Sequence, residues 1–253
     1  TQKDLRRFNK IEYLPGEHPM LIGCGSLGSH LFNQWLRMGW SNWMIADNDN
    51  MLPHNVARHI LDNAAVGYKK IEALQMVTKA ILPEKNQNDV TSFHLDVTID
   101  NEDIEKAFVK ADIIVDVSTS LAVPRLLSQK EVARCASLFI TPSGKDSVLL
   151  LEDSERNLRL HQIEAQYYNW IINHGAGETH LTGHTGSIRY GGGCRDISAT
   201  IPISSVTLHA GTLCLNGNEK ASCARVWQFN NIKGSVTAHD IQLYSSHEQK
   251  IEE

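Results

Sequence analysis

Several features that would define a class of protein are missing from this sequence. Its five cysteines are odd in number and include no C-x-x-C pair, which argues against a disulfide framework or a zinc ribbon and favours a reducing compartment. No apolar run approaches the roughly 20 residues that cross a bilayer, and no basic segment followed by an apolar one opens the chain. We therefore expect a soluble, cytoplasmic protein that does not act on membranes.

The basic side chains are too scattered for a nucleic-acid groove. Lysine and arginine number 24 against 29 acidic residues, which gives a formal net charge of −5. Phosphate backbones are bound by clustered cations, and the sequence contains no such cluster. This balance argues against nucleic acid as a partner.

Strand-like and helix-like segments alternate through the first 141 residues. Short apolar runs are each followed by a stretch with apolar residues at helical spacing. We predict strands at 19–23, 42–47, 90–95, 111–117 and 137–141, and helices at 26–39, 67–82, 102–111 and 123–136. This alternation predicts an α/β fold, a doubly wound and mostly parallel Rossmann-like sheet with helices on both faces.

The pattern changes after residue 141. We predict further strands at 147–152 and 221–229, and helices at 158–174 and 203–217. Residues 174–195 hold seven glycines and no apolar periodicity, so we expect a long mobile loop at about 174–200. We expect a single domain over residues 1–253. Because the chain begins at Thr1 and not at methionine, it is also compatible with a piece of a longer multidomain protein.

A glycine-rich turn lies between the first predicted strand and the first long helix. In GCGSLG, Gly23, Gly25 and Gly28 have G-x-G-x-x-G spacing in the strand, turn and helix context that the motif requires. Without side chains there, phosphate oxygens can approach backbone N–H groups at the helix N-terminus. Asp47, at the end of the second strand, can hold a ribose. Taken alone, these residues suit NAD, FAD or another nucleotide.

The polar residues after the second strand narrow the choice of nucleotide. Asp47 and Asp49 form a D-x-D pair, which is followed by Asn55, Arg58 and Lys70. An amide donor and two cations near one nucleotide suit a triphosphate whose charge must be neutralised during transfer. For either cation in isolation, an ordinary charged helix surface would be the simpler interpretation.

The order of these residues is similar to that in the ThiF/MoeB superfamily of ubiquitin-activating-type adenylating enzymes. The resemblance implies that the chain uses ATP and magnesium to activate the C-terminal carboxylate of a ubiquitin-like or other protein, with release of pyrophosphate. It also implies that Asp47 binds the ribose, that Asn55, Arg58 and Lys70 contact the triphosphate, and that Arg58 acts in catalysis by stabilising the departing pyrophosphate. His59 stands where the family commonly has glutamine.

The sequence departs from the family pattern after the fourth strand. There the family has an acid, two residues and a second acid that binds magnesium, whereas this chain has Asp116 followed by Thr119. Because threonine has no carboxylate, we expect phosphates and waters to hold magnesium together with Asp116 or Asp49. The paired C-x-x-C motifs of many relatives are also absent, which points away from the sulfur-carrier branch.

A cysteine in the glycine-rich segment is the candidate nucleophile. The stretch RYGGGCRDIS places Cys194 between three glycines and Arg195, a cation that can stabilise a thiolate. This motif, residues 138–168 and the closing ARVWQF look like bacterial activating enzymes, often fused to a conjugating-enzyme domain, from anti-phage operons of the CBASS type. The resemblance implies that Cys194 attacks the acyl adenylate and passes the protein to a conjugating cysteine. It also implies a homodimer.

Other interpretations of these features stay open. Cys194 could be an incidental thiol in a structural turn. An NAD(P)-dependent oxidoreductase would use the same glycine turn, although it has no need of Asn55, Arg58 and Lys70. A non-catalytic nucleotide-binding scaffold of the same fold is suggested by Thr119.

The histidines and the remaining cysteines are weaker candidates. His174, His180 and His184 could ligate zinc, but no cysteine or acid completes a recognised pattern, so we expect solvated loop histidines and predict no metal site in the protein itself. The other cysteines lie in the phosphate turn or in predicted core elements: Cys24, Cys135, Cys214 and Cys223.

Overall fold

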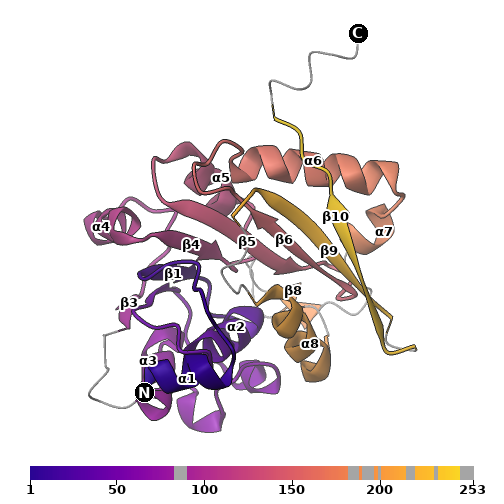
Figure 1. Ribbon diagram of the computed structural model, residues 1–253. Coiled ribbons are helices and arrows are strands. Elements are labelled where there is room, and N and C mark those ends of the chain that lie inside the picture. Colours follow the sequence, from indigo (N-terminus) through magenta and orange to yellow (C-terminus); the bar gives the residue numbers. More distant parts are fainter. Residues whose placement is uncertain are drawn as a thin grey trace.

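An eight-stranded sheet forms the centre of the computed structural model, in the order β10-β9-β6-β5-β4-β1-β2-β3 (Figure 1). The structure describes residues 1–82, 90–181, 188–189, 197–198, 201–214, 220–230 and 233–245. Five strands are parallel: β1 (Pro19–Ile22), β2 (Met44–Ala46), β3 (Thr91–Phe93), β4 (Ile113–Asp116) and β5 (Arg134–Ile140). Three more continue the sheet beyond β5 in antiparallel order: β6 (Asp146–Leu151), β9 (Cys223–Asn230) and β10 (Ser235–Ile241). The predicted doubly wound and mostly parallel sheet is confirmed.

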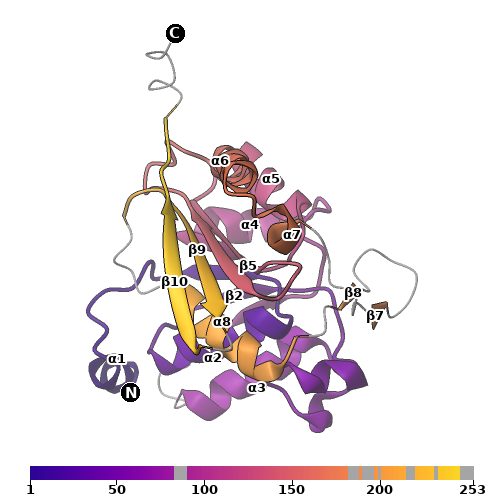
Figure 2. The same ribbon diagram turned by 90° about the vertical axis from the view of Figure 1, so that its right-hand side faces the viewer.

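Helices cover both faces of this sheet (Figure 2). One face carries α2 (Ser26–Arg37), α3 (Lys70–Ile81) and α8 (Ile203–Leu213), and the other carries α4 (Glu102–Lys110), α5 (Ala122–Gln129) and α6 (Leu160–Asn173). Successive side chains of a strand point into different cores: Leu21 and Ile45 belong to the core beneath α2, and Met20 and Met44 belong to the core on the opposite face. Strands buried on both faces consist of continuous apolar runs, which is why the sequence signal for them is strong. In the described ranges, no helix has both the length and the apolar character that crossing a membrane requires.

Two predicted segments have a different structure. The sequence predicts a helix through residue 136, but α5 ends at Gln129 and Arg134 begins β5. The apolar residues of β5 are buried on both faces, so their run cannot be told from a helical stripe by periodicity. The expected loop from residue 174 is interrupted by a short helix, α7 (Gly177–His180), on which His180 is buried.

The sequence also failed to indicate two elements at the edges of the molecule. Strand β10 is an edge strand whose first four residues are all exposed, so it lacks the alternation that marks a half-buried strand. Helix α1 (Gln2–Phe8) has no buried residue. The remaining elements are two 3-10 helices, η1 (Pro53–Ala57) and η2 (Asn63–Ala65), and a two-stranded sheet of β7 (Ile188–Arg189) and β8 (Ile197–Ser198).

Candidate functional site

A cavity of about 910 Å³ opens at the C-terminal ends of β1, β2, β4 and β5. It lies where the chain order of the sheet reverses, because β2 and β3 follow β1 on one side and β4 lies on the other. Ligands of open α/β sheets bind at this switch point. The cavity brings together most of the predicted site residues, namely Gly23, Gly25, Asp47, Asp49, Asn55, Arg58, Lys70 and Asp116.

The three glycines of the turn have different structural roles. Gly23 has a φ of +92°, and a Cβ there would lie 2.6 Å from Ser118 Cα. A Cβ on Gly28 would lie 2.0 Å from the Gly23 carbonyl oxygen, so Gly28 packs beneath the turn and is not among the residues that line the cavity. Gly25 lines the cavity at the N-cap of α2, with nothing within 4 Å of an added Cβ. Two glycines thus allow close packing, and the third leaves space for a ligand.

Alanine at Gly28 is therefore expected to lower stability, and alanine at Gly25 is expected to weaken nucleotide binding. Gly28→Ala overpacks the turn and should lower the free energy of unfolding by about 1–3 kcal/mol or more. Gly25→Ala should change it by less than about 1 kcal/mol, yet weaken nucleotide binding because its methyl group enters the cavity. Chemical denaturation and a nucleotide titration measure the two quantities. Equal destabilisation by both substitutions would contradict these different roles.

The carboxylate of Asp47 is held at the end of β2 by two backbone donors. The Cys24 N–H donates to Oδ2 at 2.6 Å, and the Asp49 N–H donates to Oδ1 at 2.8 Å. Desolvation raises the pKa of Asp47, an effect that the Lys70 ammonium opposes. The first βα turn and the candidate ribose-binding carboxylate therefore form one hydrogen-bonded unit.

Lys70 is not an ordinary surface cation. It is the first residue of α3, it is buried, and its Nζ donates to Asp49 Oδ2 at 2.7 Å. The Lys70 N–H also donates to the Asp49 carbonyl at 3.1 Å. A buried ammonium needs a charged or polar partner, and this one has Asp49 beside the cavity.

Asn55 and Arg58 reach the cavity from η1 and the loop after it. Asn55 Oδ1 accepts from the Leu52 N–H at 2.9 Å, and the Asn55 carbonyl accepts from the N–H of Arg58 and of His59, both at 2.9 Å. The short 3-10 helix thus orders the segment that presents the arginine. Both residues were predicted from the local sequence. The turn of η1 brings them to the same cavity that Lys70 lines.

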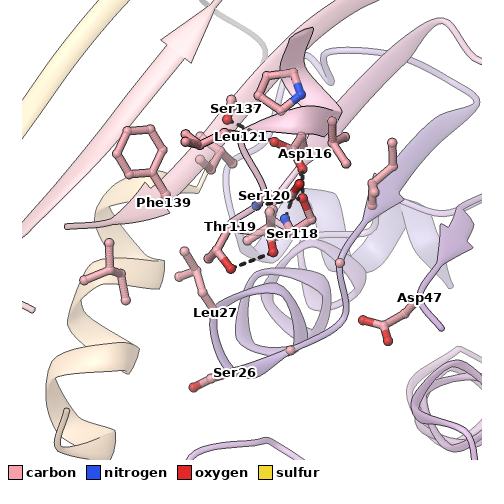
Figure 3. Close-up of a pocket in the computed structure, with 18 of the residues that line it drawn as sticks. Ser26, Leu27, Asp47, Asp116, Ser118, Thr119, Ser120, Leu121, Ser137 and Phe139 are labelled. Atoms are coloured by element: carbon pink, nitrogen blue, oxygen red, sulfur yellow. Dashed lines mark hydrogen bonds between the residues drawn. The ribbon is translucent and has the colours of Figure 1, made fainter. Parts of the chain in front are cut away.

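Asp116 lines the cavity at the end of β4, where its carboxylate accepts three hydrogen bonds from serines (Figure 3). Its Oδ1 accepts from the N–H of Ser118 at 3.0 Å and from its Oγ at 2.6 Å, and its Oδ2 accepts from Ser137 Oγ at 3.1 Å. Burial raises the pKa of this carboxyl to about 6, although the hydrogen bonds from Ser118 and Ser137 lower the pKa in part. Asp116 therefore stabilises the strand ends, and the sequence did not indicate its serine partners.

The described residues offer only part of a coordination shell for magnesium, which usually takes one or two carboxylates together with phosphates and waters. Asp116 is engaged with two serines, Asp49 is paired with Lys70, and the Thr119 hydroxyl donates to the Ser118 carbonyl at 2.6 Å. Over the ranges that the structure describes, no group of three or more histidines, cysteines and acids could hold a metal ion. Thr119 also has a φ of +58°, which is unusual for a β-branched residue.

The predicted nucleophile Cys194 lies outside the described residues, as do Arg195 and His184. Three other cysteines are poorly suited to nucleophilic attack. Burial raises the pKa of the Cys24 and Cys135 thiols well above the usual value, and it raises that of Cys214 to about 12. Cys135 lies in β5, not in the helix predicted for it.

The prediction of solvated histidines is wrong for His180. Its ring is buried in the cavity wall, with Nδ1 2.6 Å from the Tyr167 hydroxyl and Nε2 3.1 Å from Asp146 Oδ2. His174, by contrast, is exposed and stacks on Trp170.

Two aromatic side chains form part of the same cavity wall. The Tyr167 ring meets the Phe139 ring edge to face, with 5.8 Å between the ring centroids, and both residues line the cavity. Phe139 lies near the C-terminal end of β5, a position that the switch-point rule could have indicated. No local pattern indicated that His180 would be buried in the cavity wall.

Comparison with known proteins identifies relatives of this chain. The sequence model of the ThiF family matches residues 8–141. The ATP-dependent ubiquitin transferase-like protein Cap2 of Enterobacter hormaechei subsp. hoffmannii (strain UCI 50) is 31% identical over 97 residues, which are 38% of this chain and 16% of that protein. The chain thus matches only a small part of this relative.

Solved structures share the fold. MccB of E. coli superposes with a TM-score of 0.58 at 15% identity, over 97% of this chain and 66% of MccB. PaaA superposes with a TM-score of 0.58 at 14% identity, over 95% of this chain and 75% of PaaA. At such low identities the likeness concerns the fold alone.

Proposed function

Because the chain belongs to the ThiF family, we propose that its cavity binds ATP and adenylates the C-terminal carboxylate of a protein or peptide. The observation that carries this proposal is the convergence of Asp47, Asn55, Arg58 and Lys70 on one cavity above the glycine turn. One carboxylate, one amide and two cations suit the ribose and the triphosphate of a nucleotide. Two cations beside the glycine turn favour a triphosphate over a dinucleotide, which carries fewer phosphate charges at this position.

In the proposed reaction, an oxygen of the substrate carboxylate attacks the α-phosphorus of ATP. The bond between that phosphorus and the oxygen that bridges to the β-phosphorus breaks, and pyrophosphate leaves with the electron pair. Arg58 and Lys70 stabilise the negative charge that develops on the leaving group, because both are cations on the cavity wall. Magnesium would be held mainly by the phosphates and waters, with Asp49 as a partly exposed carboxylate of the cavity, and would supply further positive charge to the phosphates.

We further propose that the Cys194 thiolate attacks the carbonyl carbon of the acyl adenylate. AMP then leaves, and the resulting thioester transfers the protein to a cysteine of a conjugating enzyme or of a fused conjugating domain. The transfer step is supported by the name of the Enterobacter relative, a ubiquitin transferase-like protein. The adenylation step is supported by MccB, which has been crystallised with ATP and with AMPCPP and MccA. A ubiquitin-like substrate, a homodimer and a role in an anti-phage operon are parts of the same proposal.

Exchange of labelled pyrophosphate into ATP tests the adenylation step. Exchange that appears only with a candidate protein or peptide, and not with the same molecule amidated at its C-terminus, is the expected result. Binding of ATP without exchange for any candidate would favour the scaffold. Binding of NAD in preference to ATP would favour the oxidoreductase.

A further inference from the structure

Residues 58–60 are joined to the glycine turn and to the start of α2 by side-chain hydrogen bonds. Ser26 Oγ donates to the Arg58 carbonyl at 2.9 Å, and His30 Nε2 lies 3.2 Å from the same oxygen. In the opposite direction, His59 Nε2 lies 2.8 Å from the Cys24 carbonyl oxygen, within the turn itself. His59 is thus the side chain by which the arginine loop contacts the backbone of the phosphate turn.

The hydrogen bonds of His59 determine which ring nitrogen carries the proton. The Leu61 N–H donates to Nδ1 at 3.1 Å, so Nδ1 must present a lone pair. The proton of the neutral ring then lies on Nε2, which donates to the Cys24 carbonyl. Burial lowers the pKa of His59 to about 4, so the ring stays neutral at physiological pH. Both ring nitrogens are used within the protein, and neither is left for a ligand.

The carbonyl that His59 holds shares a peptide group with the N–H of Gly25. A trans peptide is planar, and its C=O and N–H point in opposite directions. Fixing the Cys24 carbonyl toward His59 therefore turns the Gly25 N–H away from His59. Gly25 is the N-cap of α2, it lines the cavity, and its surroundings are open. The N-terminus of a helix attracts anions through such N–H groups.

We propose that His59 is a positioning residue, which directs the Gly25 N–H at a phosphate oxygen of the bound nucleotide by holding the Cys24 carbonyl. The inference rests on the nucleotide-binding part of the proposed function. The Cys24 N–H is meanwhile held by Asp47, so both backbone polar groups of Cys24 are fixed by side chains from other segments. Without His59 the Cys24–Gly25 peptide can rotate, and the donor that faces the phosphate is lost.

A comparison of ATP and adenosine separates this role from a general structural one. Removing both hydrogen bonds with His59→Leu should weaken ATP binding by about 10- to 100-fold, whereas adenosine, which has no phosphate, should change by less than about threefold. His59→Gln is the matched control, because its amide keeps one donor and one acceptor and should leave both affinities within about threefold of wild type. Isothermal titration calorimetry of each purified variant with ATP and with adenosine measures the two affinities and their ratio.

Equal losses for ATP and adenosine, or no loss for either, would overturn the proposal. If His59→Leu does not fold, the wild-type chain still tests whether the Gly25 N–H meets a phosphate, which the proposal requires. The amide proton of Gly25 in a ¹⁵N-labelled sample should shift downfield with ATP and not with adenosine, and an unchanged Gly25 signal at saturating ATP would contradict the proposal. Absence of pyrophosphate exchange in a protein with the expected ATP-to-adenosine ratio would count against adenylation alone. Failure to bind ATP at all would remove both proposals.

Discussion

Replacement of Arg58 with alanine is expected to lower substrate-dependent pyrophosphate exchange by at least about 100-fold, the usual cost of removing a group that stabilises developing charge. Arg58 lines the cavity with Lys70, and its backbone is fixed by Asn55 and Ser26. The guanidinium can therefore stay close to the leaving group without a large rearrangement. Because the Arg58 backbone makes these contacts whatever its side chain, the variant should fold normally, and the loss should appear in the exchange rate.

Arg37→Ala provides the matched control for this experiment. Arg37 is an exposed arginine in the last turn of α2, where its Nε donates to Asn33 Oδ1 at 3.1 Å, and it does not line the cavity. Its replacement should leave the exchange rate within about twofold, as expected for a surface substitution. Normal exchange in Arg58→Ala, or an equal loss in both variants, would show that the proposed role of Arg58 is wrong.

The second large effect is expected at Cys194. Cys194→Ala should keep pyrophosphate exchange near the wild-type rate, because adenylation precedes the attack of the thiol, and should abolish the covalent adduct that thiols release. Cys194→Ser should instead accumulate an oxygen ester that resists thiols and is cleaved by alkali. Gel electrophoresis with and without dithiothreitol distinguishes the two kinds of bond.

Cys24, Cys135 and Cys214 are internal controls for the assignment of the nucleophile. Burial raises the pKa of each thiol, so none of the three should form the adduct at neutral pH. A thiol-labile adduct that persists in Cys194→Ala would assign the nucleophile to another cysteine. Loss of exchange together with the adduct would place Cys194 in the adenylation step instead.

The fold could be predicted wherever burial leaves a periodic pattern. Strands β1, β2, β4 and β6 are buried throughout and were recognised as apolar runs. Prediction failed at β10, an exposed edge strand, and at the boundary between α5 and β5, where a buried strand follows a helix with little to separate the two patterns. Strand β10 is defined by its pairing with β9, and the start of β5 is defined by its pairing with β4. The local sequence does not show which strand will be the neighbour.

Local sequence was sufficient to name most residues of the candidate nucleotide site. The spacing of Gly23, Gly25 and Gly28, and the order of Asp47, Asn55, Arg58 and Lys70, depend on residues close together in the chain, and all of these except Gly28 line one cavity. Their roles in binding and catalysis remain predictions that the experiments above test. The strand, turn and helix context of the motif was enough because it is a local property of the backbone.

The tertiary structure alone decided how these groups are supported. His59 meets Cys24 across 35 positions of sequence, and Ser137 meets Asp116 across 21. Phe139, Tyr167 and His180 form a wall of the cavity although they belong to β5, α6 and α7. Such contacts depend on which strands become neighbours and on how each helix lies against the sheet. No local pattern encodes them, because burial and hydrogen bonding between distant segments arise only when the chain has folded.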